Sequence, residues 1–295
     1  MNKIRLSYSA LENLQVCERK FQLDRLLEGA PPKQDYPATV FGKAYGVGIS
    51  TYLLTQDSTE AIYKAFLEYF PILEDDKRTE EKLIFSLLTI FPRLDQLLLE
   101  WTVASFNFKP AIELSFRVDI DDDYYYVGYI DLVLKSRFSE RYAILEVKTT
   151  GMSLENIEPL YKNSGQALGY SIVLDAIAGE ANTDYDVIYC VSQDKTRTKE
   201  WNVVPQILTF PKTIKDRLGW FITLGMDVQR LHTMAETKVY PLRGGSCMQY
   251  MRPCFHFGTC SLTTGDRNKE PEEDLIVYDF NYQLNDLIAA HLERV

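Results

Sequence analysis

GYIDLVLKSRFSERYAILEVKTTG, from Gly128 to Gly151, is the stretch that decides the fold. β-Branched and aromatic residues dominate the runs Tyr125 to Leu134 and Tyr142 to Thr149, and a polar segment joins the two runs. This composition is typical of two neighbouring β-strands connected by a hairpin. We therefore expect the centre of the chain to form part of a β-sheet.

Two acids and a lysine interrupt these apolar runs. Asp131 lies in the first run, and Glu146 and Lys148 lie two residues apart in the second, so the alternation of a strand places Glu146 and Lys148 on one face. A carboxylate is costly to bury unless a cation, a proton or water compensates it. The pattern predicts a charged site on the sheet; a surface hairpin with an ordinary salt bridge is the alternative for these three residues alone.

A helix follows the second strand. In NSGQALGYSIVLDAIAG, from Asn163 to Gly179, apolar residues recur at helical spacing, and the terminal glycine is a suitable stop. Gln166 and Tyr170 are four residues apart and share one helix face.

The order Asp-x14-Glu-x-Lys, followed by Gln-x3-Tyr, resembles the RecB-type branch of the PD-(D/E)XK nucleases. The resemblance implies a restriction-endonuclease-like fold and hydrolysis of phosphodiester bonds with Mg²⁺ or Mn²⁺. Carboxylate and carbonyl oxygens are the ligands that these cations prefer. By resemblance, the metal ligands are Asp131, Glu146 and the carbonyl of Val147, Lys148 orients and helps deprotonate the attacking water, and Gln166 and Tyr170 contact the nucleic acid.

Two further positions are compared with the same family. Glu113 stands where the family often has a glutamate, which implies an accessory metal ligand; a salt bridge is the alternative. Many members carry Gly-x3-His on an earlier helix, with the histidine as a metal ligand. Here Gly42 matches the glycine, but Gly46 occupies the histidine position. The resemblance therefore implies a metal shell without an imidazole.

Cysteines form a second pattern. Cys17 lies in a helix-like segment near the N-terminus, and GGSCMQYMRPCFHFGTC places Cys247, Cys254 and Cys260 at spacing C-x6-C-x5-C. The arrangement resembles AddB-type and CRISPR-adaptation nucleases, in which four such cysteines hold a 4Fe-4S cluster, and it implies a cluster here. A structural Zn²⁺ is the alternative, although the paired C-x2-C knuckles of zinc ribbons do not occur. The fifth cysteine, Cys190, lies in an apolar strand and is predicted to be a core residue.

The composition is that of an ordinary globular protein. The 295 residues are 46% hydrophobic and 25% charged, with a net charge of −10. This charge excludes a protein that coats nucleic acid by bulk electrostatics, so DNA contacts must come from a local basic groove or from metal. The charged N-terminus does not resemble a secretory signal, and no apolar run approaches the length of about 18 residues that spans a membrane. We expect a cytoplasmic protein, in a bacterium or a phage-infected host cell.

Outside the motifs, the chain alternates between helical and β patterns. Ser9, with Glu12 three residues later, predicts the N-cap of the first helix. A helical insertion is predicted at about 56–104, interrupted by Pro71 and Pro92. Two later strands are joined by a basic loop. Its charges are most simply solvated hairpin charges, but beside a nuclease site they could contact phosphates. These basic residues are Lys195, Arg197 and Lys199.

Together these patterns predict one α/β domain at 1–264, a mixed sheet flanked by helices, with a cysteine segment at about 244–261. The tail at 265–295 is predicted to clamp the core or to bind a partner. The expected function is that of a metal-dependent DNA exonuclease acting on ends or single strands in recombination, repair or phage replication. The alternative is a catalytically weak module that binds DNA or a helicase, recombinase or CRISPR-adaptation protein.

Overall fold

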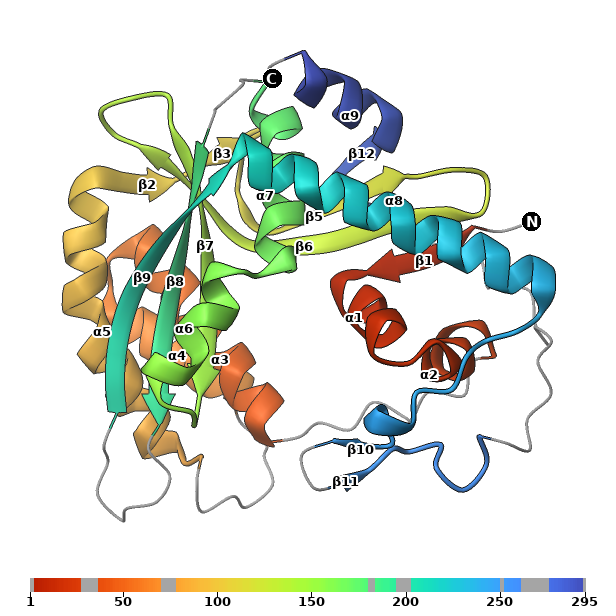
Figure 1. The fold of residues 1–295 in the computed structure, drawn as a ribbon. Helices are drawn as coiled ribbons and strands as arrows, with labels where there is room; N and C mark the ends of the chain where they lie inside the picture. Colours follow the sequence, from red (N-terminus) through yellow and green to blue (C-terminus); the bar gives the residue numbers. More distant parts are fainter. Residues whose placement is uncertain are drawn as a thin grey trace. The chain divides into compact units, whose positions relative to one another are not determined.

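The computed structural model describes residues 3–27, 37–69, 78–179, 184–194, 203–249, 252–260 and 276–293. The chain divides into two compact units (Figure 1). The first comprises Met1–Lys33, Ser115–Gly128 and Leu218–Val295, and the second comprises Gln34–Leu114 and Tyr129–Arg217. The prediction of a single domain at 1–264 stays a prediction.

Eight of the described strands form a mixed sheet in the order β12-β5-β6-β7-β8-β9, with β1 and β2 also paired to β6. The pairs β6–β7, β8–β9 and β2–β6 are antiparallel, and β1–β6, β7–β8 and β12–β5 are parallel. The strands are β1 (Ile4–Ser7), β2 (Trp101–Val103), β5 (Ile112–Asp119), β6 (Tyr124–Ser136), β7 (Tyr142–Thr150), β8 (Asp184–Asp194), β9 (Val203–Thr213) and β12 (Phe280–Gln283). Two short pairs, β3 (Ser105–Phe106) with β4 (Lys109–Pro110) and β10 (Met248–Gln249) with β11 (Arg252–Pro253), lie off this sheet.

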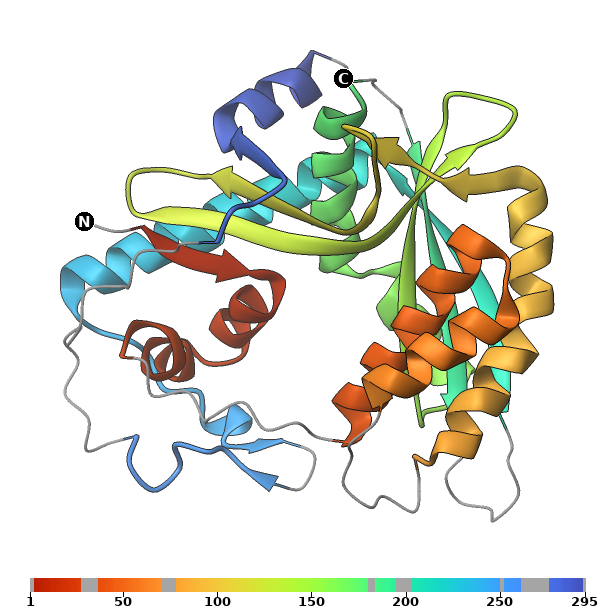
Figure 2. The ribbon, with the colours of Figure 1, turned by 180° about the vertical axis from the view of Figure 1, so that it is seen from behind.

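In the second unit, helices cover both faces of the sheet. One face of β6, β7 and β8 packs on α3, α4 and α5 in a core that includes Leu132, Leu145 and Ile188. Figure 2 shows these helices together on one side, whereas Figure 1 shows α6 on the other. The helices are α3 (Pro37–Thr55), α4 (Ser58–Tyr69), α5 (Glu80–Glu100), α6 (Leu154–Lys162) and α7 (Gly165–Ala178). The sheet residues that alternate with this core therefore face α6 and α7.

The structure confirms both central strands and the helix that follows them, and within the described part of 56–104 it shows the expected helices, α4 and α5. Gly179 ends α7 in the left-handed conformation (φ 68°), which a residue without Cβ adopts at low cost. One prediction was wrong, because Pro92 lies inside α5 and does not interrupt it. A proline costs a helix about 3 kcal/mol. The stripe of Leu83, Leu87 and Ile90 is buried, and each such side chain contributes about 1.5–3 kcal/mol, which offsets that cost.

The first unit contains the N-terminal helices α1 (Tyr8–Val16) and α2 (Glu18–Phe21) and the π-helical turn η1 (Gln22–Leu26). The predicted N-cap was wrong: Ser7, not Ser9, accepts from the Ala10 amide. The reason is that β1 pairs with β6 up to Ser7, so the chain leaves the sheet there. Cys17 separates α1 from α2 in extended conformation (φ −163°, ψ 111°) and is not within a continuous helix.

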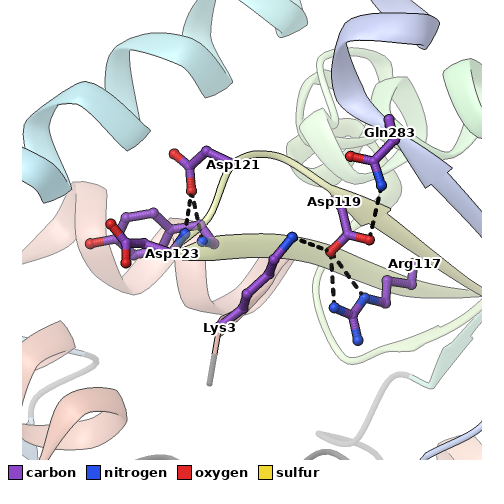
Figure 3. A network of polar contacts seen from close by, with 7 residues as sticks. Lys3, Arg117, Asp119, Asp121, Asp123 and Gln283 are labelled. Carbon is purple, nitrogen blue, oxygen red and sulfur yellow. Dashed lines mark hydrogen bonds and ion pairs between the residues drawn. The ribbon is translucent and has the colours of Figure 1, made fainter. Parts of the chain in front are cut away.

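The C-terminal part of the chain supplies α8 (Ile214–Thr237), the 3₁₀ turn η2 (Gly244–Ser246), β12 and α9 (Leu284–Leu292). Strand β12 pairs with β5 in parallel, from Phe280 opposite Phe116 to Gln283 opposite Asp119. Figure 3 shows Asp119 between Lys3, Arg117 and Gln283, with Lys3 Nζ 3.0 Å and Gln283 Nε2 3.2 Å from its carboxylate. The tail's predicted role as a clamp or a partner-binding element stays a prediction.

Some predicted features lie outside the described residues. These are Pro71 and the basic loop with Lys195, Arg197 and Lys199. Among the described helices, none has both the length and the apolar character that a membrane crossing requires.

Candidate active site and cysteine pocket

Asp131 and Glu146 lie on neighbouring antiparallel strands, β6 and β7. The register pairs Leu132 with Leu145, so the two acids next to this pair share the opposite face of the sheet. The Asp131 carboxylate also accepts a hydrogen bond from the Val147 amide at 2.9 Å. The strand pairing itself therefore fixes the two carboxylates close together.

Lys148 lies on the same face as Glu146, and its Nζ is 2.8 Å from Glu146 Oε2. The Glu146 side chain is 1% exposed, and burial raises its pKa to about 7, with Asp131 adding repulsion and Lys148 opposing the shift. Burial likewise raises the pKa of Asp131, although Lys148 and the Val147 amide favour its charged form. The pKa of Lys148 is raised, because Glu146 and Asp131 outweigh its own desolvation. One ammonium group thus neutralises part of a buried acidic pair.

Glu113 is a third carboxylate near this pair. It lies on β5 with φ at 49°, which is unusual for a residue with a Cβ. Burial raises the pKa of Glu113, and the charge of Asp131 raises it further, while Lys43 lowers it. The structure therefore brings the predicted accessory acid into electrostatic contact with the two central acids.

Gln166 and Tyr170 lie one turn apart on α7, and Gln166 Nε2 donates to the Tyr170 hydroxyl at 2.9 Å. The side chain of Ser164 caps this helix by accepting from the Ala167 amide. Burial and the charge of Glu146 raise the pKa of Tyr170, so the phenol faces the acidic pair and stays protonated. All of the residues predicted for the active site thus lie in the same unit and around the same carboxylates.

Sequence reasoning missed two tyrosines at this site. Tyr189 on β8 is opposite Glu146 in the strand register, and the Tyr161 ring at the end of α6 stacks on it with 4.5 Å between ring centroids. Burial raises the pKa of both phenols, to about 12 for Tyr189, and the charge of Lys148 opposes this shift in each. The available signal was the alternation of β8, which gives Tyr189 a fixed face once its register with β7 is known. Tyr161 carried no such signal.

Helix α3 approaches β7 at the glycines that were compared with the family's Gly-x3-His. A Cβ on Gly42 would lie 3.4 Å from Thr149 Oγ1, an ordinary contact distance, whereas a Cβ on Gly46 would meet no atom of the described residues within 4 Å. Gly46 therefore leaves open space on α3 where the family often places its histidine.

The acidic site fits a hard divalent cation by the chemistry of its donors. Glu146 Oε1 is buried and accepts no hydrogen bond from any residue that the structure describes, and a buried unsatisfied carboxylate oxygen is costly unless a cation compensates it. Asp131 and Glu113 add further oxygen donors, which suit Mg²⁺ and Mn²⁺. As they stand, no three His, Cys, Asp or Glu side chains within the described ranges are arranged to hold a metal ion. Lys148 Nζ lies 2.8 Å from Glu146 Oε2, so a metal ion that used this oxygen would have to displace Lys148 from it.

A cavity of about 180 Å³ in the first unit brings the four predicted ligand cysteines together, although they are far apart in the sequence. Cys17 comes from the junction of α1 and α2, and Cys247, Cys254 and Cys260 come from the C-terminal segment. Hydrogen bonds from the Cys254 amide to the Cys247 carbonyl (2.8 Å) and from the Cys260 amide to the His256 carbonyl (2.8 Å) shape this segment. The walls are completed by Lys20, Leu23, Leu242, Ser246, His256 and Phe257.

Burial and the neighbouring charges act in opposite directions on the thiols of this cavity. Lys20 lines the cavity, and burial raises the pKa of Cys260, although the guanidinium of Arg19 opposes this shift. His256 is 2.7 Å from the carboxylate of Asp24. Cys190 is fully buried in the core of the second unit, as expected for a packing residue. Thiolates are the ligands that soft metals and iron–sulfur clusters take, but as they stand these four thiols, all within the described residues, are not arranged to hold a metal ion.

Comparisons with known proteins concern the family and the fold of this chain. Residues 5–256 match the model of a family described as the PD-(D/E)XK nuclease superfamily. A solved structure from Eubacterium rectale, described as a candidate exonuclease, has a TM-score of 0.50 and 12% sequence identity, with 83% of this chain and 86% of that chain covered. At this identity the likeness concerns the fold alone. No curated protein matches the chain.

Proposed function

Because this chain belongs to the PD-(D/E)XK nuclease superfamily, we propose that it hydrolyses phosphodiester bonds of DNA with Mg²⁺ or Mn²⁺. The observation that carries the proposal is the grouping of Asp131, Glu146 and Lys148 on one face of two adjacent strands. Members of the superfamily generally use these cations, and the buried, unsatisfied oxygen of Glu146 provides a reason for a cation here.

The metal would be held by Asp131, Glu146 and the carbonyl of Val147, with Glu113 as an accessory ligand. When bound, Mg²⁺ or Mn²⁺ supplies positive charge that neutralises the phosphate and makes water more acidic. Asp131 is oriented for this role by the Val147 amide, which leaves its other oxygen for a ligand. The pairing of β6 with β7 keeps both carboxylates in place without substrate.

Lys148 would orient the attacking water and stabilise the hydroxide as it forms. Its ammonium group lies 2.8 Å from Glu146 Oε2, which supports a role beside the metal ligands once the cation takes over that oxygen. Gln166 and Tyr170 would contact the phosphate backbone. The Tyr170 phenol, which burial keeps protonated, is suited to donate a hydrogen bond to a phosphate oxygen.

We further propose that the enzyme is an exonuclease that trims DNA ends or single strands during recombination, repair or phage replication. The structure from Eubacterium rectale that shares this fold is described as a candidate exonuclease, which favours an exonuclease, and the substrate and process are those that the family resemblance implies. We place this activity in the reducing cytoplasm of a bacterium or an infected host cell. A helicase, a recombinase or a CRISPR-adaptation protein would be a suitable partner.

One observation favours the alternative of a catalytically weak module that binds DNA or such a partner. Gly46 offers no imidazole to the metal, and the space beside it is open. Incubation of the purified protein with end-labelled single- and double-stranded DNA distinguishes the two functions. We expect degradation with Mn²⁺ that stops with EDTA. Metal-independent DNA binding without cleavage would favour the alternative.

The pH dependence of metal binding follows from Glu146. Its pKa of about 7 means that the metal-free site holds a proton below pH 7, and the metal must displace that proton. We expect the affinity for Mn²⁺ to be highest above pH 7 and to fall by up to about tenfold for each pH unit below it. Calorimetric titrations at pH 6, 7 and 8, in buffers that differ in ionisation enthalpy, measure both the affinity and the proton released. An affinity that is constant across this range would refute the assignment.

We also propose that Cys17, Cys247, Cys254 and Cys260 hold a 4Fe-4S cluster, with a structural Zn²⁺ as the alternative. The shared cavity supports a thiolate site, and the resemblance to AddB-type nucleases favours iron. Anaerobically purified protein is expected to be brown, with broad visible absorbance that disappears when Cys254 is replaced by serine. A colourless protein with stoichiometric zinc would instead identify the structural metal site.

A further inference from the structure

Glu18 is a fully buried carboxylate in the first unit, directly after the candidate ligand Cys17. The extended backbone of Cys17 ends α1 and starts a new helix at Glu18. A buried carboxylate is costly unless it is paired and hydrogen-bonded. The residues that pair with Glu18 therefore show which segment of the chain it binds.

Two arginines from the C-terminal part of the chain bind this carboxylate. Arg243 Nε and Nη2 donate to its two oxygens at 2.8 and 2.5 Å, and Arg230 of α8 also donates to Glu18 Oε1. The arginines hold the pKa of Glu18 at about 2, against the opposing effect of burial. Arg243 lies four residues before Cys247, and the Cys247 sulfur is 3.9 Å from the Arg243 carbonyl. The ion pair thus connects the segment of the first cysteine with that of the other three.

Hydrogen bonds to backbone carbonyls also join the N-terminal helices to the cysteine segment. Arg19 donates from its guanidinium to the Cys260 carbonyl at 3.1 and 3.3 Å, and from its amide to the Pro241 carbonyl at 3.1 Å. The Ser246 hydroxyl donates to the Val16 carbonyl at 2.5 Å. Both ribbon views show the η2–β11 segment beside α2 (Figures 1 and 2). None of these contacts uses a thiol.

We propose that Glu18 positions the cysteine segment on the N-terminal helices, so that protein contacts form the thiol cavity before any metal or cluster binds. Glu18 is a positioning residue, because it acts through Arg243 and Arg230 and does not line the cavity itself. Two N–H groups of Arg243 must meet the two oxygens of Glu18 at the same time. This bidentate ion pair therefore forms only when the cysteine segment is docked in one position on the N-terminal helices.

Hydrogen–deuterium exchange of the full-length chain, as purified and after treatment with chelator and reductant, tests the proposal. In metal-free wild-type protein, peptides covering 241–260 are expected to be protected. Glu18→Gln should accelerate their exchange by at least about tenfold and increase the labelling rate of Cys247, Cys254 and Cys260 to a similar extent. Glu12→Gln, which removes a charge from an exposed position of α1, is the matched control and should change neither rate.

Arg243→Gln removes the same contact from the half-exposed partner and leaves Glu18 paired with Arg230, so it provides the test if Glu18→Gln fails to fold. It should also accelerate exchange of 241–260. Exchange in the metal-free wild type as fast as in the variants would overturn the proposal, because the bound group would then dock the segment. Variants that exchange as slowly as the wild type would overturn it as well, because Glu18 would be dispensable. Neither readout depends on nuclease activity.

Discussion

Replacement of Asp131 by asparagine is expected to reduce metal-dependent DNA cleavage by at least about 10³-fold. A catalytic metal contributes several kcal/mol to transition-state stabilisation, and each 1.4 kcal/mol is a factor of ten in rate. Asparagine keeps the size of the side chain and an oxygen that can accept from the Val147 amide at 2.9 Å, so the strand pairing should survive. The measurement is the initial rate of degradation of end-labelled DNA with Mn²⁺.

Glu158→Gln is the control for Asp131→Asn. It also removes one negative charge from the second unit, but from an exposed position on α6. Its cleavage rate should remain within about twofold of the wild type, as expected for a surface substitution. If Asp131→Asn cleaved DNA at the rate of this control, Asp131 would have no part in catalysis.

Replacement of Lys148 by methionine is expected to reduce the cleavage rate by about 10² to 10⁴-fold, the usual contribution of a positioned proton-transfer group. In contrast to Asp131→Asn, this variant should bind Mn²⁺ at least as tightly as the wild type. The reason is that Lys148 Nζ now holds Glu146 Oε2 at 2.8 Å and competes with the metal for that oxygen. Single-turnover cleavage and Mn²⁺ titration of the same preparation measure the two effects.

The two effects of Lys148→Met separate its proposed role from a structural one. A lysine that only neutralised the buried acids of β6 and β7 could be replaced with little loss of rate once Mn²⁺ had taken over its charge. Saturating Mn²⁺ that restored wild-type cleavage to Lys148→Met would therefore contradict a role in activating water.

The central part of the fold could be predicted because its patterns are local. The runs Tyr125 to Leu134 and Tyr142 to Thr149 have strand composition, and β6 and β7 extend them by only a few residues. The spacing of Gln166 and Tyr170 likewise predicted one face of α7, where the two side chains are hydrogen-bonded. When a site is formed by two consecutive strands and the next helix, the strand and helix periodicities are enough to predict which of its residues share a face.

Features that depend on distant pairing could not be predicted in this way. The N-cap at Ser7 depends on the pairing of β1 with β6, which the first residues alone do not reveal. Pro92 stays within α5 because the buried stripe of that helix outweighs the cost of the proline. Tyr161 joins the site only because its ring stacks on Tyr189 of β8. In each case the outcome depends on tertiary contacts that the local sequence does not show.

The cysteine pattern lies between these extremes. Spacing alone grouped Cys247, Cys254 and Cys260, but only a family resemblance connected them with Cys17. The structure adds what the pattern could not contain, namely the ion pairs of Glu18 with Arg230 and Arg243. These partners are more than 200 positions apart in the sequence. Helix and strand periodicity cannot predict contacts between residues so far apart.

Direct binding of Mn²⁺ tests most sharply whether Asp131 and Glu146 jointly hold a divalent cation. Free Mn²⁺ can be measured by electron paramagnetic resonance during a titration at pH 8, where Glu146, with its pKa of about 7, is mostly ionised. We predict a site in the wild type and in Glu158→Gln that is lost in both Asp131→Asn and Glu146→Gln. Equal Mn²⁺ binding by all four proteins would contradict a metal centre at these two carboxylates.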